Sequence, residues 1–241
     1  MKSERLRKIF HPFTNIPGVR KIFGPIFRAL IYYPARRREI KCFQRNALHV
    51  LKEFDKICKE NNINYCLFWG SLIGAVREHG FIKHDFDIDV AVWKDDYSDK
   101  FKDALLENGF SHKHRFLIDK GESAMEDTFE KDGVAIDIFY FFEDASKGAY
   151  CTSFDYMEDC ITWEECFQRF GNVKIKRFFF DLPHKFDYVP FENIELPIPR
   201  NYDSILRSTY GDNYMTPDPE WKSDNYEEKK WVGKVVEFEK Y

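Results

Sequence analysis

Three aspartates, Asp85, Asp87 and Asp89, occupy every second position of the segment HDFDIDVAVW. Side chains of a β-strand alternate between its two faces, so Asp87 and Asp89 project from the same side if this segment is a strand. Two carboxylates this close repel each other, and a hard divalent cation relieves the repulsion. Because Mg²⁺ takes oxygen ligands from one or two carboxylates, water and substrate phosphates, the spacing predicts a magnesium site, with Asp85 in the preceding loop.

A turn of small residues lies upstream of these aspartates. Gly70 allows a close approach of the backbone to a ligand, and Ser71 is expected to cap a helix that ends near Gly80. The first N–H groups of such a helix favour phosphate, and Arg77 and Lys83 would add positive charge to the same oxygens. The turn is therefore predicted to bind phosphate opposite the metal.

A third carboxylate, Asp137, is the lone acid in the apolar run from Val134 to Phe142. A buried carboxylate is costly unless it has a function, and Asp87, Asp89 and Asp137 together suit in-line phosphoryl or nucleotidyl transfer with Mg²⁺ or Mn²⁺. An isolated D-x-D also occurs on the solvated face of a strand. The combination with the Gly-Ser turn and the later buried acid favours a functional interpretation.

The elements that must position these residues follow from the apolar spacing. A helical period and terminal Asn, Ser and Gly residues predict helices, whereas short apolar or alternating runs predict strands. The expected helices are 38–62, 71–80, 95–108 and 202–210, and the expected strands are 64–69, 86–93, 110–118, 123–129 and 134–142. This order predicts an α/β or α+β fold with a mixed sheet flanked by helices. Residues 145–190 have weak periodicity and are interpreted as an insertion that shapes an acceptor site.

Charge is distributed unevenly along the chain of 241 residues. Residues 1–45 hold 12 Lys or Arg against 2 acids, whereas the remaining residues hold 25 basic and 39 acidic side chains. We expect a basic, helical N-terminal arm over residues 1–37 and one catalytic domain over residues 38–241. The arm either contacts anionic lipid headgroups peripherally or packs on its own acidic domain. Nucleic acid is not expected as a partner, because the acidic domain would repel it.

Arg28, Pro25 and Pro34 interrupt the apolar residues of the arm, so we do not expect it to span a membrane. The cysteines form no C-x-x-C pair and follow no secretion signal, which favours free thiols and a cytoplasmic location, with a peripheral position at the inner face of a membrane as the alternative. Zinc at Cys151, Cys160 and Cys166 is a weaker interpretation than ordinary thiols, because their spacing matches no zinc-ligand pattern.

The run WGSLIGAVREHGFIKHDFDID, residues 69–89, resembles the signature of the LicD and fukutin-related family within the nucleotidyltransferase-fold superfamily. IDIF at 136–139 and YGDNYMTP at 210–217 are similar to the downstream motifs of that family, and the resemblance extends over about residues 40–220. His84 and Phe86 stand where members of the family often have tryptophan followed by acids, so one auxiliary carboxylate is missing here.

The resemblance implies a phosphotransferase that moves a phosphorylated alcohol, such as phosphocholine or a polyol phosphate, from a CDP-linked donor to a hydroxyl of a cell-surface glycan or lipid-linked glycan, releasing CMP. Asp87 and Asp89 would hold the metal, and Asp137 would complete the metal site or deprotonate the acceptor. Gly70 and Ser71 would hold the donor phosphate. By the same resemblance Arg77 would neutralise the diphosphate.

Two other functions stay open from the sequence. An enzyme of the same fold could instead attack the α-phosphate of a nucleoside triphosphate and release pyrophosphate. A catalytically silent protein could use the turn to hold a nucleotide, although the presence of all three carboxylates argues against that alternative.

Overall fold

The computed structural model describes residues 33–158, 160, 162–181, 185–218 and 231–241. Most of the predicted N-terminal arm, residues 1–32, therefore lies outside the described residues. The described chain begins in α3 (Tyr33–Glu60), which confirms the helix predicted from residue 38 and extends it through the predicted domain boundary at residues 37 and 38. None of the helices in the described part of the chain combines the length and apolar composition that a bilayer crossing requires.

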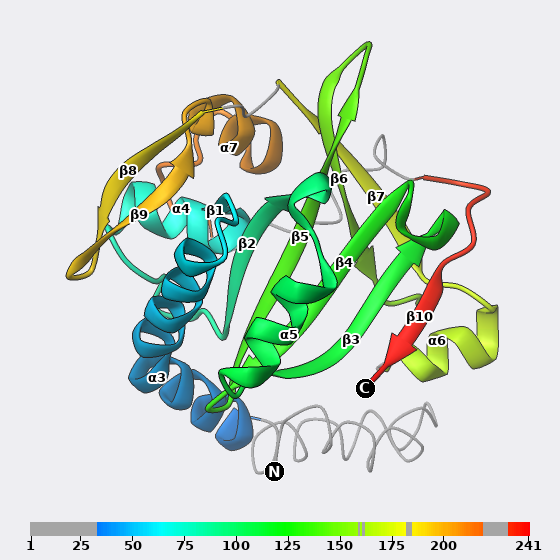
Figure 1. Ribbon diagram of the computed structural model, residues 1–241, viewed down its shortest axis with the longest axis horizontal. Coiled ribbons are helices and arrows are strands. Elements are labelled where there is room, and N and C mark those ends of the chain that lie inside the picture. Colours follow the sequence, from blue (N-terminus) through cyan, green and yellow to red (C-terminus); the bar gives the residue numbers. More distant parts are fainter. Residues whose placement is uncertain (1–32, 159, 161, 182–184, 219–230) are drawn as a thin grey trace.

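The centre of the molecule is an eight-stranded mixed sheet (Figure 1). Its main path has the order β1-β2-β5-β4-β3-β10, and β6 joins the end of β5 to β7. The bounds are β1 (Tyr65–Leu67), β2 (Asp87–Trp93), β3 (Ser111–Ile118), β4 (Ala124–Lys131), β5 (Val134–Asp144), β6 (Gly148–Asp155), β7 (Lys174–Phe180) and β10 (Glu237–Lys240). A separate hairpin pairs β8 (Phe186–Phe191) with β9 (Ile194–Pro199).

One strand pair sets the position of the acidic residues. β2 and β5 are parallel, whereas β5 is antiparallel to β4 and β4 to β3. The register of the parallel pair places Asp89 opposite Asp137 and Asp87 opposite Ala135. The sheet therefore brings together carboxylates that are far apart in the sequence.

The helices α3 and α5 (Asp99–Glu107) lie on the face of the sheet nearest the viewer in Figure 1. Apolar residues of α3 recur three or four positions apart and are buried against this face: Phe43, Ala47, Val50, Leu51, Phe54, Ile57 and Cys58. Ser98 caps α5 by accepting a hydrogen bond from the Phe101 backbone N–H, so α5 begins later than the residue 95 predicted from the sequence.

The segment 145–190, which showed weak periodicity, folds into β6, α6 (Trp163–Phe170), β7 and β8. Thr162 caps α6 and Gly171 ends it in a left-handed conformation. This segment packs beside β3 and β10 around a second apolar cluster that includes Phe116, Phe154 and Val173. At the other end of the sheet, α4 (Trp69–Arg77) and α7 (Tyr202–Tyr210) lie next to the β8–β9 hairpin (Figure 1).

Candidate active site

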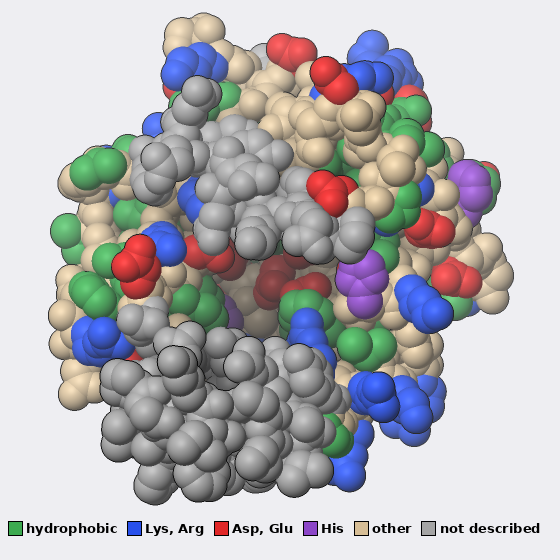
Figure 2. Space-filling model, turned by 180° about the vertical axis from the view of Figure 1, so that it is seen from behind, with side chains coloured by type: hydrophobic (Ala, Val, Ile, Leu, Met, Phe, Trp, Pro, Cys, Tyr) green, Lys and Arg blue, Asp and Glu red, His purple; other side chains and the backbone are tan. Residues whose placement is uncertain are grey.

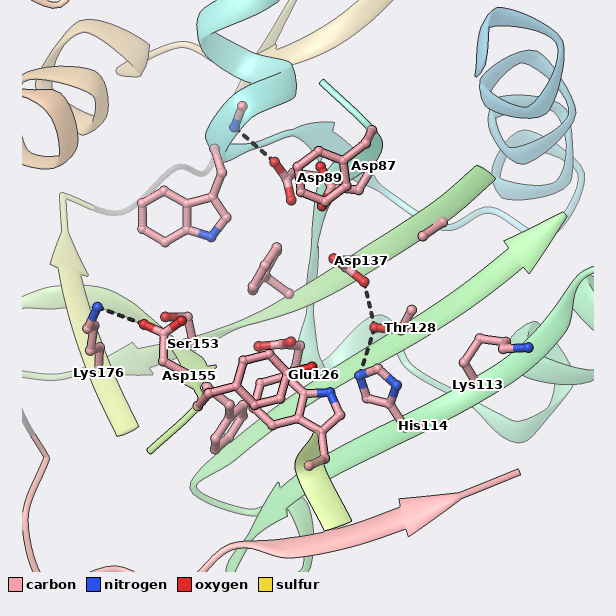
Figure 3. Close-up of a pocket in the computed structure, with 18 of the residues that line it drawn as sticks. Asp87, Asp89, Lys113, His114, Glu126, Thr128, Asp137, Ser153, Asp155 and Lys176 are labelled. Carbon is pink, nitrogen blue, oxygen red and sulfur yellow. Dashed lines mark hydrogen bonds and ion pairs between the residues drawn. The ribbon is translucent and has the colours of Figure 1, made fainter. Parts of the chain in front are cut away.

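A hollow with acidic side chains opens on the face of the sheet opposite α3 and α5 (Figure 2). It corresponds to a cavity of about 1180 Å³ whose lining includes Asp87, Asp89 and Asp137. Asp87 and Asp89 come from alternate positions of β2 and lie side by side, and Asp137 faces them from β5 (Figure 3). The predicted cluster of three carboxylates is thus formed at the wall of one cavity.

The first turn of α4 orients Asp89. The backbone N–H of Gly70 donates to Asp89 Oδ2 at 2.9 Å, and Ser71 Oγ accepts from the backbone N–H of Asp89 at 3.0 Å. A side chain at Gly70 would place its Cβ 3.0 Å from that carboxylate oxygen, so glycine is needed for the close approach. Trp69 at this turn has a φ of 39°, a strained conformation for a non-glycine residue and one that concentrates at functional sites.

The prediction that Ser71 caps this helix is wrong. The helix begins at Trp69, Phe68 is its N-cap, and no side chain caps it. Ser71 is buried within the first turn, and its hydroxyl is used to hold strand β2 instead. Gly70 lines the cavity, while Ser71 is not one of its lining residues.

Arg77 and Lys83 are not among the residues that line the cavity with the carboxylates. Arg77 ends α4, where it donates to Glu78 Oε1 at 3.0 Å and to the Tyr214 carbonyl at 3.4 Å. Lys83 is exposed in the loop before β2, and its carbonyl accepts a hydrogen bond from Gln44. Neither residue lines the described cavity, and their contact with donor phosphate stays a prediction.

Burial disfavours the ionised form of all three carboxylates, and repulsion from neighbouring carboxylates adds to it at Asp87 and Asp89. Burial, with the charges of Asp137 and Asp85, raises the pKa of Asp87 to about 7. Burial raises the pKa of Asp89 well above its usual value, and Asp87 and Asp137 add to the effect. Burial also raises the pKa of Asp137 to about 6, although a hydrogen bond from Thr128 opposes the shift. Such carboxylates are stabilised by a bound cation.

Thr128 and His114 hold Asp137 from the neighbouring strands (Figure 3). Thr128 Oγ1 donates to Asp137 Oδ1 at 2.5 Å and lies 3.1 Å from His114 Nε2. Burial lowers the pKa of His114 to about 4, so its ring is neutral near pH 7. With the Thr128 hydroxyl proton directed at Asp137, the His114 Nε2–H donates to Thr128, and this chain fixes the orientation of the Asp137 carboxylate.

The carboxylates suit a hard divalent cation without forming a complete protein cage. Among the described residues, no three His, Cys, Asp or Glu side chains converge as ligands of one ion. Asp87 and Asp89 supply the two adjacent carboxylates that Mg²⁺ usually takes from a protein when phosphate and water complete its coordination. Their raised pKa values fit the same role, because the charge that burial disfavours is stabilised by a cation.

The cysteine trio does not form a zinc site in the described residues. Cys151 belongs to the main core, whereas Cys160 and Cys166 belong to the second apolar cluster. All six cysteines are free thiols.

Several residues of the cavity were not singled out from the sequence. They are His114, Glu126, Thr128, Tyr156, Trp163 and Lys176. The sequence did contain one signal for Glu126. Like Asp137, Glu126 and Asp127 are acids within a predicted strand, here 123–129. Tyr156, Trp163 and Lys176 come from segment 145–190, whose weak periodicity did not predict which of its residues face a common site.

Comparisons with known proteins agree with this geometry. The family model described as LicD/FKTN/FKRP, nucleotidyltransferase domain, matches residues 62–201. The chain is 26% identical over 182 residues to the ribitol-5-phosphate transferase FKTN of Mus musculus, an alignment that covers 74% of this chain and 35% of that protein. It is 37% identical over 79 residues to the lipopolysaccharide cholinephosphotransferase LicD of Haemophilus influenzae, which covers 33% of this chain and 27% of that protein.

The alignments thus span about a third of the length of these relatives. The match to the family model, by contrast, takes in more than half of the present chain, from three residues before β1 to two residues after β9. It includes Asp87, Asp89 and Asp137 and the turn that orients them. The chain therefore belongs to the LicD/FKTN/FKRP family of nucleotidyltransferase domains.

Proposed function

We propose that this protein is a metal-dependent phosphotransferase that moves a phosphorylated alcohol from a CDP-linked donor to a hydroxyl of a glycan and releases CMP. The observation that carries the proposal is the cluster of Asp87, Asp89 and Asp137, half-buried and close together at the wall of a large cavity. The names of two relatives support the reaction class, since one is a ribitol-5-phosphate transferase and the other a cholinephosphotransferase.

Asp87 and Asp89 would hold Mg²⁺ or Mn²⁺, which when bound neutralises diphosphate charge and polarises the phosphorus that is attacked. The acceptor oxygen forms a bond to the phosphorus that carries the alcohol, and the bond from that phosphorus to the bridging oxygen breaks. CMP leaves with the bridging oxygen and its electron pair. Gly70 supplies the surface of the turn against which the donor phosphates would lie.

Asp137 would take the proton of the acceptor hydroxyl. Its carboxylate is held by Thr128 on the next strand, apart from the adjacent pair on β2. A fixed carboxylate near the reacting hydroxyl is the geometry that a general base needs.

Calorimetric titration of CDP, CMP and CDP-choline, with and without Mg²⁺, tests the proposal. We expect metal-dependent binding of the cytidine nucleotides to the wild type and its loss in Asp87→Ala. A screen of CDP-choline and CDP-ribitol for CMP release then identifies the donor. Binding of a nucleoside triphosphate with pyrophosphate release, in place of cytidine binding, would contradict the proposal and favour nucleotidyl transfer.

We also propose a peripheral membrane position, on the cytoplasmic side, for the basic segment of residues 1–37. Its support is the excess of basic over acidic residues in the sequence, since charge of this kind attracts anionic headgroups. Sedimentation with vesicles containing phosphatidylserine is expected for the full chain and not after deletion of residues 1–36. Unchanged sedimentation of the shortened chain would contradict a membrane role for this segment.

A further inference from the structure

The cavity continues beyond the three aspartates into a region that the proposed reaction does not use. We call it the distal region. It is formed by β4, β6, α6 and β7 and contains Glu126, Ser153, Asp155, Tyr156, Trp163 and Lys176 (Figure 3). Glu126 lies two positions before Thr128 on the same face of β4, so the distal region adjoins the Asp137 end of the candidate active site.

Glu126 is the first observation that indicates a ligand in the distal region. Its side chain lines the cavity although the residue is only 7% exposed. Its Oε2 has no hydrogen-bond partner among the described residues. A buried polar atom without a partner destabilises the fold, so its retention at a cavity wall indicates a group that it bonds when the cavity is filled.

Aromatic surface is the second observation. Tyr156 and Trp163 stack with ring centroids 3.9 Å apart and an interplanar angle of 24°, and both line the cavity. Trp163 is held by Phe116, which meets it edge to face at 4.9 Å. A rigid, flat apolar surface beside a few polar groups binds ligands that have both an apolar face and hydroxyls.

The charges of the distal region distinguish between ligand classes. Lys176 pairs with Asp155 at 2.7 Å, and Lys240 pairs with Glu164, so two ammonium groups line the cavity together with their carboxylate partners. Because each ammonium group is paired with a carboxylate, the wall offers hydrogen-bond donors and acceptors side by side. Mixed donors and acceptors beside an aromatic surface suit a neutral ring with several hydroxyls.

We propose that the distal region is a sugar-ring subsite, in which the Tyr156–Trp163 pair packs against the C–H face of a pyranose and Glu126 hydrogen-bonds one of its hydroxyls. The inference rests on the proposed function in one respect, that the bound sugar is then the acceptor whose hydroxyl reaches Asp137. The binding of the sugar itself depends on neither metal nor donor.

Saturation-transfer NMR with methyl glucopyranoside, methyl galactopyranoside and methyl N-acetylglucosaminide tests the subsite, with choline chloride as the cationic comparison. We expect transfer to the ring protons of at least one pyranoside in the wild type. Glu126→Leu should raise the apparent Kd for that pyranoside at least tenfold, and Glu126→Gln should retain part of the affinity. Glu130→Leu, at the cavity wall on the same face of β4, should change it less than twofold.

The aromatic surface is tested in the same assay. Trp163→Leu should abolish transfer, while Trp163→Phe, which keeps an aromatic face, should restore most of it. The proposal would be overturned if none of the pyranosides gave a signal that depends on Trp163. A choline signal that depends on Glu126 would also overturn it. Asp89→Asn separates this inference from the proposed function, because sugar binding should persist in that variant even if cytidine binding fails.

Discussion

Glu126 and Asp127 are neighbours on β4, both are buried, and they point to opposite faces of the sheet. Asp127 accepts two hydrogen bonds from Arg115, at 2.8 and 3.0 Å, one from Tyr140 at 2.9 Å, and has His112 Nε2 at 2.6 Å. Although burial alone would raise it, the pKa of Asp127 lies below its usual value because His112 and Arg115 stabilise the carboxylate.

On the cavity face the compensation is weaker. Burial raises the pKa of Glu126 well above its usual value, and the charges of Asp137 and Asp155 raise it further. For Asp89 the strongest neighbouring charges are also carboxylates. Burial of an acid alone therefore does not indicate function. A buried acid whose partners are built into the fold contributes to stability, whereas buried acids that repel each other at a cavity indicate a ligand.

The largest expected effect is the loss of turnover in Asp89→Asn. The substitution removes a charge that would act on the metal, and electrostatic groups of this kind are worth on the order of 10²- to 10³-fold in rate. Its stability should equal or exceed that of the wild type, because one source of carboxylate repulsion is gone. CMP release and thermal unfolding measure the two quantities. Turnover within tenfold of the wild type would mean that the charge of Asp89 is not needed for the reaction.

Asp127→Asn is expected to show the opposite pattern. It leaves Arg115 buried without its carboxylate, and breaking a buried pair costs about 3–5 kcal/mol. Turnover at low temperature should stay within about threefold, since Asp127 faces away from the cavity. Urea unfolding checks the free energy of unfolding. Replacing both Asp127 and Arg115 with Leu should cost less than Asp127→Asn alone, and an equal cost would argue against an unpaired charge as the cause.

The two faces should also differ in their response to pH. The raised pKa values of Asp87 and Asp137, about 7 and 6, mean that folding favours their protonated forms, so their contribution to stability is full below about pH 4 and is lost as pH rises to 7. The lowered pKa of Asp127 has the opposite effect on stability. Its contribution is present above the usual pKa of an aspartate and is lost as pH falls below that pKa.

Metal-free protein should therefore lose roughly 5 °C or more of Tm between pH 5 and 7.5, since 1 kcal/mol corresponds to about 2–4 °C in a domain of this size. Mg²⁺ should reverse part of the loss at pH 7.5 in the wild type and not in Asp89→Asn. Calorimetry in EDTA and in Mg²⁺ measures both. A Tm that rises over this range without metal would mean that the cavity carboxylates are compensated as Asp127 is.

Thr128→Val is expected to lower turnover about tenfold, the typical effect of losing a group that orients a functional side chain. The hydroxyl that donates to Asp137 disappears while the shape is kept. Thr152→Val is the matched control, because Thr152 is buried in β6 with its Oγ1 unpartnered in the described chain, and turnover there should not change. Equal losses in both variants would indicate a packing effect instead of orientation of Asp137.

The sequence predicted the carboxylate cluster well because its geometry depends on local rules. Strand alternation places Asp87 beside Asp89, and an acid in an apolar run marks Asp137. The parallel register that brings Asp137 opposite Asp89 has no local signal, and it was not predicted from the sequence. Ser71 was misassigned because a serine after a glycine is a common helix cap, whereas here tertiary contact with β2 uses its hydroxyl.

The distal region was not predictable for a different reason. Tyr156 and Trp163 meet across a helix start and a strand end, so neither helical nor strand periodicity records their contact. The interpretation of 145–190 as a segment that shapes an acceptor site stays a prediction, although its residues line the cavity.

The smallest effect is expected for Lys83→Ala. Lys83 is exposed and does not line the described cavity, whereas the charge of Arg36, whose guanidinium lies 3.5 Å from the centroid of the Phe86 ring, lowers the pKa of Asp87. Lys83→Ala should change the donor KM less than twofold, and Arg36→Gln should shift the pH dependence of turnover upward because Asp87 then ionises at higher pH. A tenfold rise of the donor KM in Lys83→Ala would mean that Lys83 does contact the donor phosphate. The cavity carboxylates would then have a second nearby cation besides Arg36.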